Sequence, residues 1–344
     1  MFFPKSRLLQ RGATMNNKEL FIHVGYPKTA TTTFQRFLYP RHSQLDYLRK
    51  NNANISFIND LFFARENSFS RLSGIYIHEL EHLAQDSNKD KLLYSEESLT
   101  SFSMFFRSTP APCISTIEPN SIARKLKMCF PDTNQLLTPK ILITIRRQDE
   151  LLKSMYAQVY NLVFKRFKQT NTFERFLDYT FEQNPTGFIA DALLFNEVIS
   201  NYEHLFGSEN VYVSVYEELL QDKQKYVEKL CRFMGIDANE ALTLISEHYA
   251  NKKGSTSGYH TDDRNLIELL SHHKNKYLGH RHFGLADTGL YKWLQRIYIP
   301  GRTLPKFYIP TPHRHHIQQL YTKGNQTLSE RYHLDLGRYG YYFD

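Results

Sequence analysis

The chain has 344 residues, 41% of them hydrophobic and 23% charged, a composition typical of a folded globular protein and not of a disordered one. Lysine and arginine outnumber aspartate and glutamate by 43 to 35, and the net charge of +8 suits an anionic ligand. No apolar run reaches the roughly 18 residues of a membrane-spanning helix, and three scattered cysteines exclude a disulfide framework and indicate a reducing, cytoplasmic compartment.

Apolar strands alternate with helical patterns along the chain. The expected strands are residues 20–24, 91–95, 140–145 and 211–216, and the expected helices are residues 31–39, 117–130, 149–161, 172–181, 190–206, 223–234 and 315–332. This alternation predicts an α/β fold with a central, mostly parallel sheet. We expect one domain over residues 1–344, with a disordered leader at 1–14 and an irregular insertion at 256–310 that is a candidate lid or acceptor-binding segment.

The most informative segment follows the first strand and reads GYPKTATTT over residues 25–33. Gly25 permits a sharp turn and close approach of a ligand to the backbone, and Lys28 adds a positive charge. The first N–H groups of the helix that follows have no intrahelical partner, and the helix dipole favours an anion there. The backbone and the side chains of the loop therefore predict a phosphate or sulfate site. Its expected contacts are Gly25, Lys28, Thr29, Ala30, Thr31, Thr32 and Thr33.

The spacing in this loop excludes two familiar phosphate-binding motifs. A Walker A loop needs a lysine directly after its second glycine, but Lys28 follows Gly25 by three residues and no second glycine precedes it. A dinucleotide-binding loop needs three glycines, and only one is present.

A second basic site follows the strand predicted at 140–145. Arg146 and Arg147 come directly after this strand, and Ser154 lies about two turns into the next helix. Because ligands of open α/β sheets bind beyond the carboxyl ends of strands, we expect an arginine here to share a cleft with the first loop. A guanidinium and a hydroxyl suit a terminal phosphate.

Two carboxylates, Glu96 and Glu97, follow the strand predicted at 91–95. Their side chains point in opposite directions if the strand continues, so one of them is expected to face the cleft as a general base. The alternative is that both cap the next helix, since carboxylates favour helix N-termini.

The segment from Tyr26 to Thr32, YPKTATT, resembles the 5′-phosphosulfate loop of the sulfotransferases. This family has a P-loop-NTPase-like three-layer α/β sandwich, and its donor is 3′-phosphoadenosine 5′-phosphosulfate (PAPS), which leaves as PAP. The eight-residue step from Arg146 to Ser154 is similar to the family's 3′-phosphate motif, which favours Arg146 over Arg147, although the usual asparagine and proline after the arginine are absent. The resemblance implies that Lys28 stabilises the departing phosphate.

Two further segments resemble the family. The sequence from Ser95 to Leu99, SEESL, is similar to the S-x-E-x-L of bacterial and Golgi-type sulfotransferases, which implies that Glu97 is the base and that a hydroxyl of a carbohydrate is the acceptor. A basic loop with Lys252, Lys253 and Gly254 resembles the segment that closes over the nucleotide, without the family's usual spacing.

The resemblance implies no metal and no nucleic-acid partner. Two other functions stay open: a kinase-like nucleotide-dependent phosphotransferase, disfavoured by the missing Walker lysine and magnesium carboxylates, and a non-catalytic module that binds PAP or polyanions. His23 is expected to pack beside the loop and not to act in catalysis. The cluster of His313, His315 and His316 is expected to be a solvated basic patch, because the sequence shows no further ligands near it.

Overall fold

The computed structural model describes most of the chain in separate stretches. The described residues are 17–48, 60–62, 64–100, 119–132, 136–160, 167–183, 189–249, 259–260, 264–265, 298–299, 303–304 and 307–343. The leader expected at 1–14 and most of the insertion expected at 256–310 lie outside these ranges. None of the helices within them is long and apolar enough to cross a membrane.

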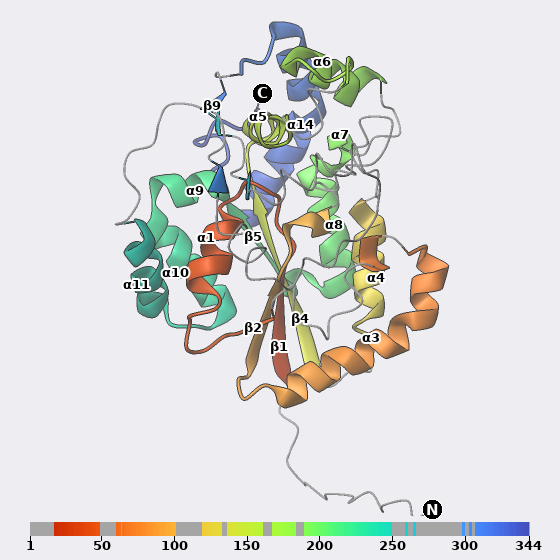
Figure 1. The fold of residues 1–344 in the computed structure, drawn as a ribbon, viewed down its shortest axis with the longest axis vertical. Helices are drawn as coiled ribbons and strands as arrows, with labels where there is room; N and C mark the ends of the chain where they lie inside the picture. The colour runs from red at the N-terminus through yellow and green to blue at the C-terminus, as the bar shows by residue number, and fades with distance from the viewer. Residues whose placement is uncertain are drawn as a thin grey trace, which may run out of the picture.

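A parallel sheet of five strands forms the centre of the fold (Figure 1). Its strands are β1 (Lys18–His23), β2 (Asp46–Leu48), β3 (Lys91–Ser95), β4 (Leu137–Ile145) and β5 (Val211–Val215), in the order β2-β3-β1-β4-β5. The four strands predicted from their apolar runs are confirmed. The short edge strand β2 was not predicted, because three residues are too few to show a period. All carboxyl ends lie at one edge of the sheet, beside the central strand β1.

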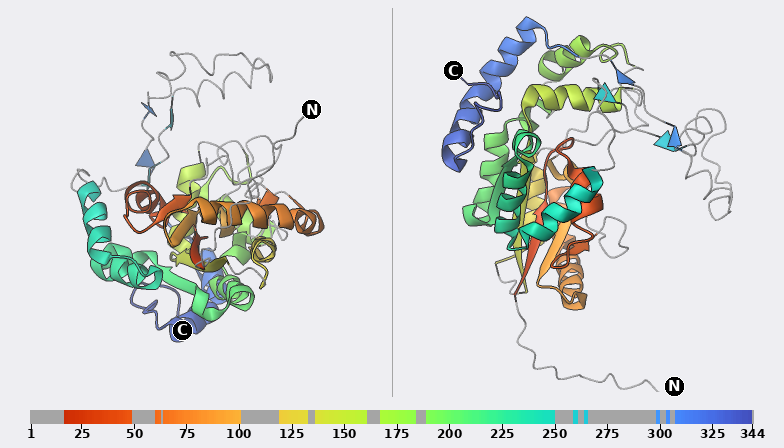
Figure 2. Two further views of the ribbon diagram at one scale, coloured as in Figure 1. Left: turned by 90° about the horizontal axis from the view of Figure 1, so that it is seen from below. Right: turned by 90° about the vertical axis from the view of Figure 1, so that its left-hand side faces the viewer.

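Helices cover both faces of this sheet, as Figure 2 shows from two directions. One face carries α1 (Thr31–Thr33), the π-helix η1 (Phe34–Leu38), α9 (Tyr216–Gln221), α10 (Lys223–Met234) and α11 (Ala238–Tyr249). The other carries α3 (Glu66–Asp86), α4 (Pro119–Met128) and α8 (Phe195–Phe206). These layers confirm the predicted α/β sandwich.

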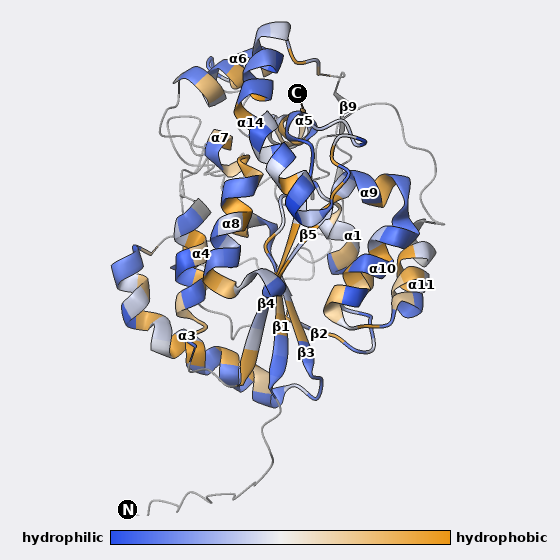
Figure 3. Ribbon diagram, turned by 180° about the vertical axis from the view of Figure 1, so that it is seen from behind, coloured by the Kyte–Doolittle hydropathy of each residue, from blue (hydrophilic) through white to orange (hydrophobic). Residues whose placement is uncertain are grey.

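Alternate residues of each strand enter two separate cores. Phe21, Leu93 and Leu142 are buried under η1 and α10, whereas their neighbours Ile22 and Ile141 face the opposite core. This alternation follows from the period of two in a strand. Figure 3 shows the result: the helices carry both polar and hydrophobic residues, while hydrophobic residues dominate much of the strands. Both faces are therefore dry, as a parallel sheet requires.

A third group of helices lies beyond the carboxyl ends of the strands, at the top of Figure 1. It comprises α5 (Gln148–Val159), α6 (Phe173–Asp178), the π-helix η4 (Tyr179–Gln183), α7 (Ile189–Ala192) and α14 (Thr311–Tyr332). Two tyrosines from different elements meet at α7: Tyr26 donates to the carbonyl of Ala192 at 2.5 Å, and Tyr321 of α14 donates to that of Ala190 at 3.0 Å. These bonds join the loop after β1 to the C-terminal helix through α7.

Several helices differ from the sequence prediction. The helix predicted at 190–206 is wrong as a single element, because Leu194 leaves the helical conformation (ψ 68°) and separates α7 from α8. The helix predicted at 31–39 is one α-turn followed by the π-helix η1. The helix predicted at 315–332 begins earlier, at Thr311, where Pro312 occupies a first-turn position that needs no N–H. The helices α3 and α11 were not predicted.

Candidate active site

The loop after β1 has the backbone of an anion cradle. Lys28 and Ala30 adopt left-handed conformations (φ 64° and 62°), and Thr29 lies between them. Non-glycine residues rarely take such values, and they persist only where the surroundings fix them. Here the Thr29 hydroxyl donates to the carbonyl of Tyr26 at 2.5 Å and closes the turn. Left-handed residues in a tight turn can direct neighbouring N–H groups into a concavity that suits anions.

Gly25 fixes how this loop leaves the sheet. A Cβ atom at this position would lie 2.7 Å from the His23 Nε2 atom and 3.0 Å from the Thr144 backbone nitrogen. Only glycine fits, and the loop consequently runs directly over the ends of β1 and β4. The next residue, Tyr26, is fully buried and donates its backbone N–H to the Thr144 carbonyl at 3.2 Å.

Arg146, the first residue after β4, reaches this loop. Its Nη1 atom donates to the carbonyl of Lys28 at 2.8 Å, and its guanidinium stacks 4.8 Å from the centre of the Tyr216 ring. The Nε atom is buried and has no hydrogen-bond partner in the part of the chain that the structure describes. A buried N–H without an acceptor is unfavourable, so a guanidinium in this state suits an anionic ligand.

Arg147 has different surroundings. It forms ion pairs with Asp149 at 2.5 Å and Glu150 at 3.1 Å, and Lys153 pairs with Glu150 at 2.8 Å. A cavity of about 320 Å³ lies beside this cluster, with Arg314 among its lining residues. The structure thus directs one arginine to the loop and the other to carboxylates at the start of α5.

The other predicted contacts divide into three groups. Thr31 and Ser154 are buried, and Ser154 lies in the second turn of α5, which begins one residue after Arg147. Thr32 is exposed and Thr33 half-buried at the start of the helix. The three residues predicted to close over the nucleotide, Lys252, Lys253 and Gly254, lie outside the described residues.

Glu97 contacts the loop directly. It is the first residue of the short 3-10 helix η2 (Glu97–Thr100), and its Oε2 atom accepts a hydrogen bond from the Thr31 hydroxyl. Glu96 is buried at 6% exposure, and its backbone N–H donates to the His23 carbonyl at 3.0 Å. The side chain of Glu97 is therefore bonded to a threonine of the loop.

A buried network of polar side chains lies under the loop, and only His23 in it was singled out from the sequence. The His23 Nδ1 atom lies 3.0 Å from the Ser95 hydroxyl, and its Nε2 atom lies 3.4 Å from that of Thr144. Thr144 in turn contacts Ser214 of β5 at 2.9 Å. Burial lowers the pKa of His23 to about 4, which keeps the ring neutral at ordinary pH. His23 therefore packs beside the loop, as predicted.

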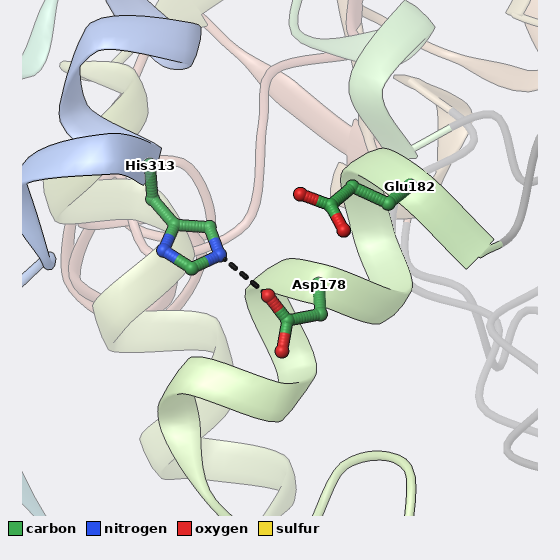
Figure 4. Close-up of side chains that lie close together, drawn as sticks. All are labelled: Asp178, Glu182 and His313. Carbon is green, nitrogen blue, oxygen red and sulfur yellow. Dashed lines mark hydrogen bonds and ion pairs between the residues drawn. The ribbon is translucent and has the colours of Figure 1, made fainter.

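The histidines of α14 are not a uniform solvated patch, which corrects the sequence reading. His313 is buried, and its Nε2 atom pairs with Asp178 at 2.8 Å, while Glu182 lies close by (Figure 4). The ligand atoms of these three residues lie within 4.8 Å of one another. However, the buried His313 Nδ1 atom has no partner among the described residues, whereas a metal-bound imidazole normally gives its second N–H to an acceptor. The geometry fits a His–Asp pair better than a metal centre.

The sulfotransferase domain family matches residues 18–279, well over half of the chain. The chain belongs to this family. It thereby shares the family's chemistry, the transfer of a sulfuryl group, and the cradle, Arg146 and Glu97 lie within the matched region of this sulfotransferase.

Solved structures of low identity resemble this sulfotransferase. A sulfotransferase from Alicyclobacillus acidocaldarius is 19% identical, with 76% of this chain and 96% of that chain covered at a TM-score of 0.43. Mouse sulfotransferase SULT7A1 complexed with PAP is 15% identical, with 94% and 87% covered at a TM-score of 0.40. Because these TM-scores lie below 0.5, they add nothing to the family match. No curated protein sequence matches the chain.

Proposed function

We propose that this sulfotransferase uses PAPS and transfers its sulfuryl group to a hydroxyl of a carbohydrate. The observation that carries the proposal is that one loop contacts both Arg146 and Glu97. Arg146 donates to the Lys28 carbonyl of this loop, and Glu97 accepts from its Thr31 hydroxyl. A cation site for one end of the donor and a carboxylate for the acceptor therefore meet at one loop. The carbohydrate acceptor rests on the resemblance of the Ser95–Leu99 segment to glutamate-type sulfotransferases.

The donor's two anionic ends suit two parts of the site. Residues 29–33 would hold the 5′-phosphosulfate through N–H groups of the left-handed turn and through the hydroxyls of Thr32 and Thr33. The hydroxyls of Thr29 and Thr31 donate within the protein. Arg146 and Ser154 would hold the 3′-phosphate, and the unpartnered Nε atom of Arg146 supports this assignment. Lys252, Lys253 and Gly254 are proposed to cover the nucleotide.

The chemical step needs a base and charge neutralisation. Glu97 would take the proton of the acceptor hydroxyl while the acceptor oxygen forms the new bond to sulfur. The bond between sulfur and the bridging oxygen breaks in line, and the electron pair stays with the departing phosphate. Lys28 would stabilise that developing negative charge. In this proposal the proton, the sulfuryl group and the leaving group are all accounted for by residues of the chain and the two substrates.

Thermal unfolding with different nucleotides tests the proposal. We expect PAP to raise the Tm of the protein without added metal, because a ligand that binds only the folded state stabilises it. Stabilisation by ATP with Mg²⁺ but not by PAP would overturn the proposal and favour a phosphotransferase. A screen of hydroxylated acceptors with PAPS then identifies the substrate.

The role of Glu97 is tested with that substrate. Glu97→Gln should keep the affinity for PAP and lose turnover, with Glu96→Gln as the matched control at the neighbouring carboxylate. Full activity in Glu97→Gln would remove Glu97 as the base, and loss of turnover in both variants would point to the turn as a whole.

A further inference from the structure

One serine hydroxyl, that of Ser95 at the end of β3, is contacted from both ends of the loop. The register of the sheet places Ser95 directly opposite His23, the last residue of β1 before the loop. The His23 Nδ1 atom lies 3.0 Å from the Ser95 hydroxyl. From the other side, the Gln35 Nε2 atom lies 3.1 Å from the same hydroxyl and 3.4 Å from the Ser95 carbonyl. Gln35 belongs to η1, which follows the loop. Residues on both sides of the loop therefore contact the same serine.

Ser95 is also two residues from Glu97. The intervening Glu96 gives its backbone N–H to the His23 carbonyl at 3.0 Å, so His23 holds the end of β3 with both its side chain and its backbone. We call His23, Ser95 and Gln35 the Ser95 bracket. It fixes three parts relative to each other: the start of the loop, the end of the loop and the turn that carries Glu97.

The hydrogen-bond directions in the bracket form one consistent set. The Gln35 amide donates to the Ser95 hydroxyl, which can then donate to His23 Nδ1. The proton of the neutral ring is then on Nε2 and faces the Thr144 hydroxyl. The Tyr39 hydroxyl lies 3.5 Å from Nδ1. Within the described residues, the ring's hydrogen-bond partners are the hydroxyls of Ser95, Tyr39 and Thr144, all of them neutral. Neutral donors and acceptors therefore fix the orientation of the imidazole without placing another charged group next to the anion site.

We infer that His23 is a positioning residue, which acts through Ser95 to hold the Lys28 loop and the Glu97 turn at a fixed separation. The inference deepens the proposed function and rests on it for its catalytic meaning, but the geometry of the bracket itself is testable without any ligand. His23 does not touch the reacting atoms in this account.

Hydrogen exchange of the loop measures the bracket directly. Leucine has a similar volume to histidine and no polar side-chain atom. In His23→Leu, the amides of residues 25, 26 and 28–35 should exchange about tenfold faster than in the unmodified protein, because each lost hydrogen bond removes on the order of 1 kcal/mol from the closed state. His23→Gln retains a donor and an acceptor and should recover part of the protection. PAP affinity should fall in the same order, with His23→Leu weakest.

Ser214→Ala is the matched control, because Ser214 belongs to the same polar network three strands away from Ser95. It should leave loop exchange and PAP affinity within about twofold of the unmodified protein. Equal exchange in His23→Leu and the unmodified protein would overturn the inference. Equal acceleration in Ser214→Ala would also overturn it, since the effect would then be general loosening.

Two outcomes separate this inference from the proposed function. If His23→Leu fails to fold, Ser95→Ala removes the shared hydroxyl and takes its place in the same experiment, with the same tenfold expectation. If the unmodified protein does not bind PAP, the proposed function fails, while the exchange data still decide whether the bracket holds the loop.

Discussion

Two regions at the carboxyl edge of the sheet, the loop after β1 and the start of α5, are built in opposite ways. Under the loop, His23, Ser95 and Thr144 are buried and neutral and are joined by hydrogen bonds. At the start of α5, Arg147 and Lys153 lie among carboxylates in partly exposed ion pairs. Ion pairs near the surface contribute little to stability and weaken in salt. Buried neutral networks, by contrast, fix a unique geometry when all their members are satisfied.

The difference explains why the adjacent Arg146 and Arg147 have different partners: Arg146 bonds to the loop, and Arg147 pairs with carboxylates of α5. On the loop side, Lys28 and Arg146 carry the positive charge that a ligand would use, and the buried groups beneath them are neutral. On the α5 side, the positive charges of Arg147 and Lys153 are neutralised by carboxylates of the protein itself. Changes on the loop side should therefore alter ligand binding and chemistry, and changes in the ion pairs of Arg147 and Lys153 should not.

The largest contrast is expected between two lysines. Lys28→Ala should lower sulfuryl transfer by about 10²–10³-fold, the range for removing one donor that stabilises a developing negative charge, and should weaken PAP binding far less. Lys153→Ala, on the α5 side, should leave turnover unchanged. Turnover of PAPS with an acceptor from the screen and PAP titration measure both quantities. Equal losses of turnover and of PAP affinity in Lys28→Ala would make Lys28 only a binding residue.

The next largest effect is a loss of folding stability at low pH. Its size tests whether His23, under the loop, is buried and neutral. Burial lowers the pKa of His23 to about 4, against 6.5 in the unfolded chain. Above pH 6.5 the ring is neutral in both states, so its contribution does not change with pH. As the pH falls from 6.5 to 4, the unfolded chain takes up the proton first, and the folded state loses about 3 kcal/mol.

Urea unfolding at pH 7, 5.5 and 4 measures this loss. His23→Gln cannot take up the proton, so its stability should fall less over that range than the stability of the unmodified protein. Parallel curves for the two proteins would contradict the assignment of a dry, neutral His23.

The smallest effect separates the two arginines. Arg146→Ala should raise the Kd for PAP by about 10–100-fold, the range for losing a charged hydrogen bond of roughly 1.5–3 kcal/mol. Arg147→Ala should change it by less than about threefold, because its guanidinium is already paired with Asp149 and Glu150. Isothermal titration with PAP gives both constants. A larger loss in Arg147→Ala would reverse the assignment of the two arginines.

The sequence was sufficient for four of the five strands of the sheet and for the loop. Strands such as β4 are continuous apolar runs, because a parallel sheet buries both faces, and the loop combines a glycine, a lysine and threonines in a short motif. Helices were less predictable. Leu194 is apolar and gives no sequence signal for the break between α7 and α8. The π-helix η1 has only five residues, too few for its different period to show in the sequence.

The sequence predicted that Arg146 and Glu97 share a cleft with the loop, but it could not predict the individual contacts between strands. Thr31 and Glu97 are 66 residues apart, and His23 meets Ser95 because of the register between β1 and β3. Nothing in either segment alone specifies that register. Likewise, Asp178 and His313 are separated by 135 residues, so the sequence showed a histidine cluster without its carboxylate partner.

The two tyrosines that meet at α7 have a consequence for how much of this chain is needed for function. Tyr321 lies in α14, outside the region shared with the family, and donates a hydrogen bond to the Ala190 carbonyl of α7. Tyr26 of the loop donates to the Ala192 carbonyl of the same helix. A protein shortened at the family boundary would keep every proposed ligand contact and lose this brace. The hydrogen bonds that hold the loop in place thus extend beyond the shared region, as far as the C-terminal helix.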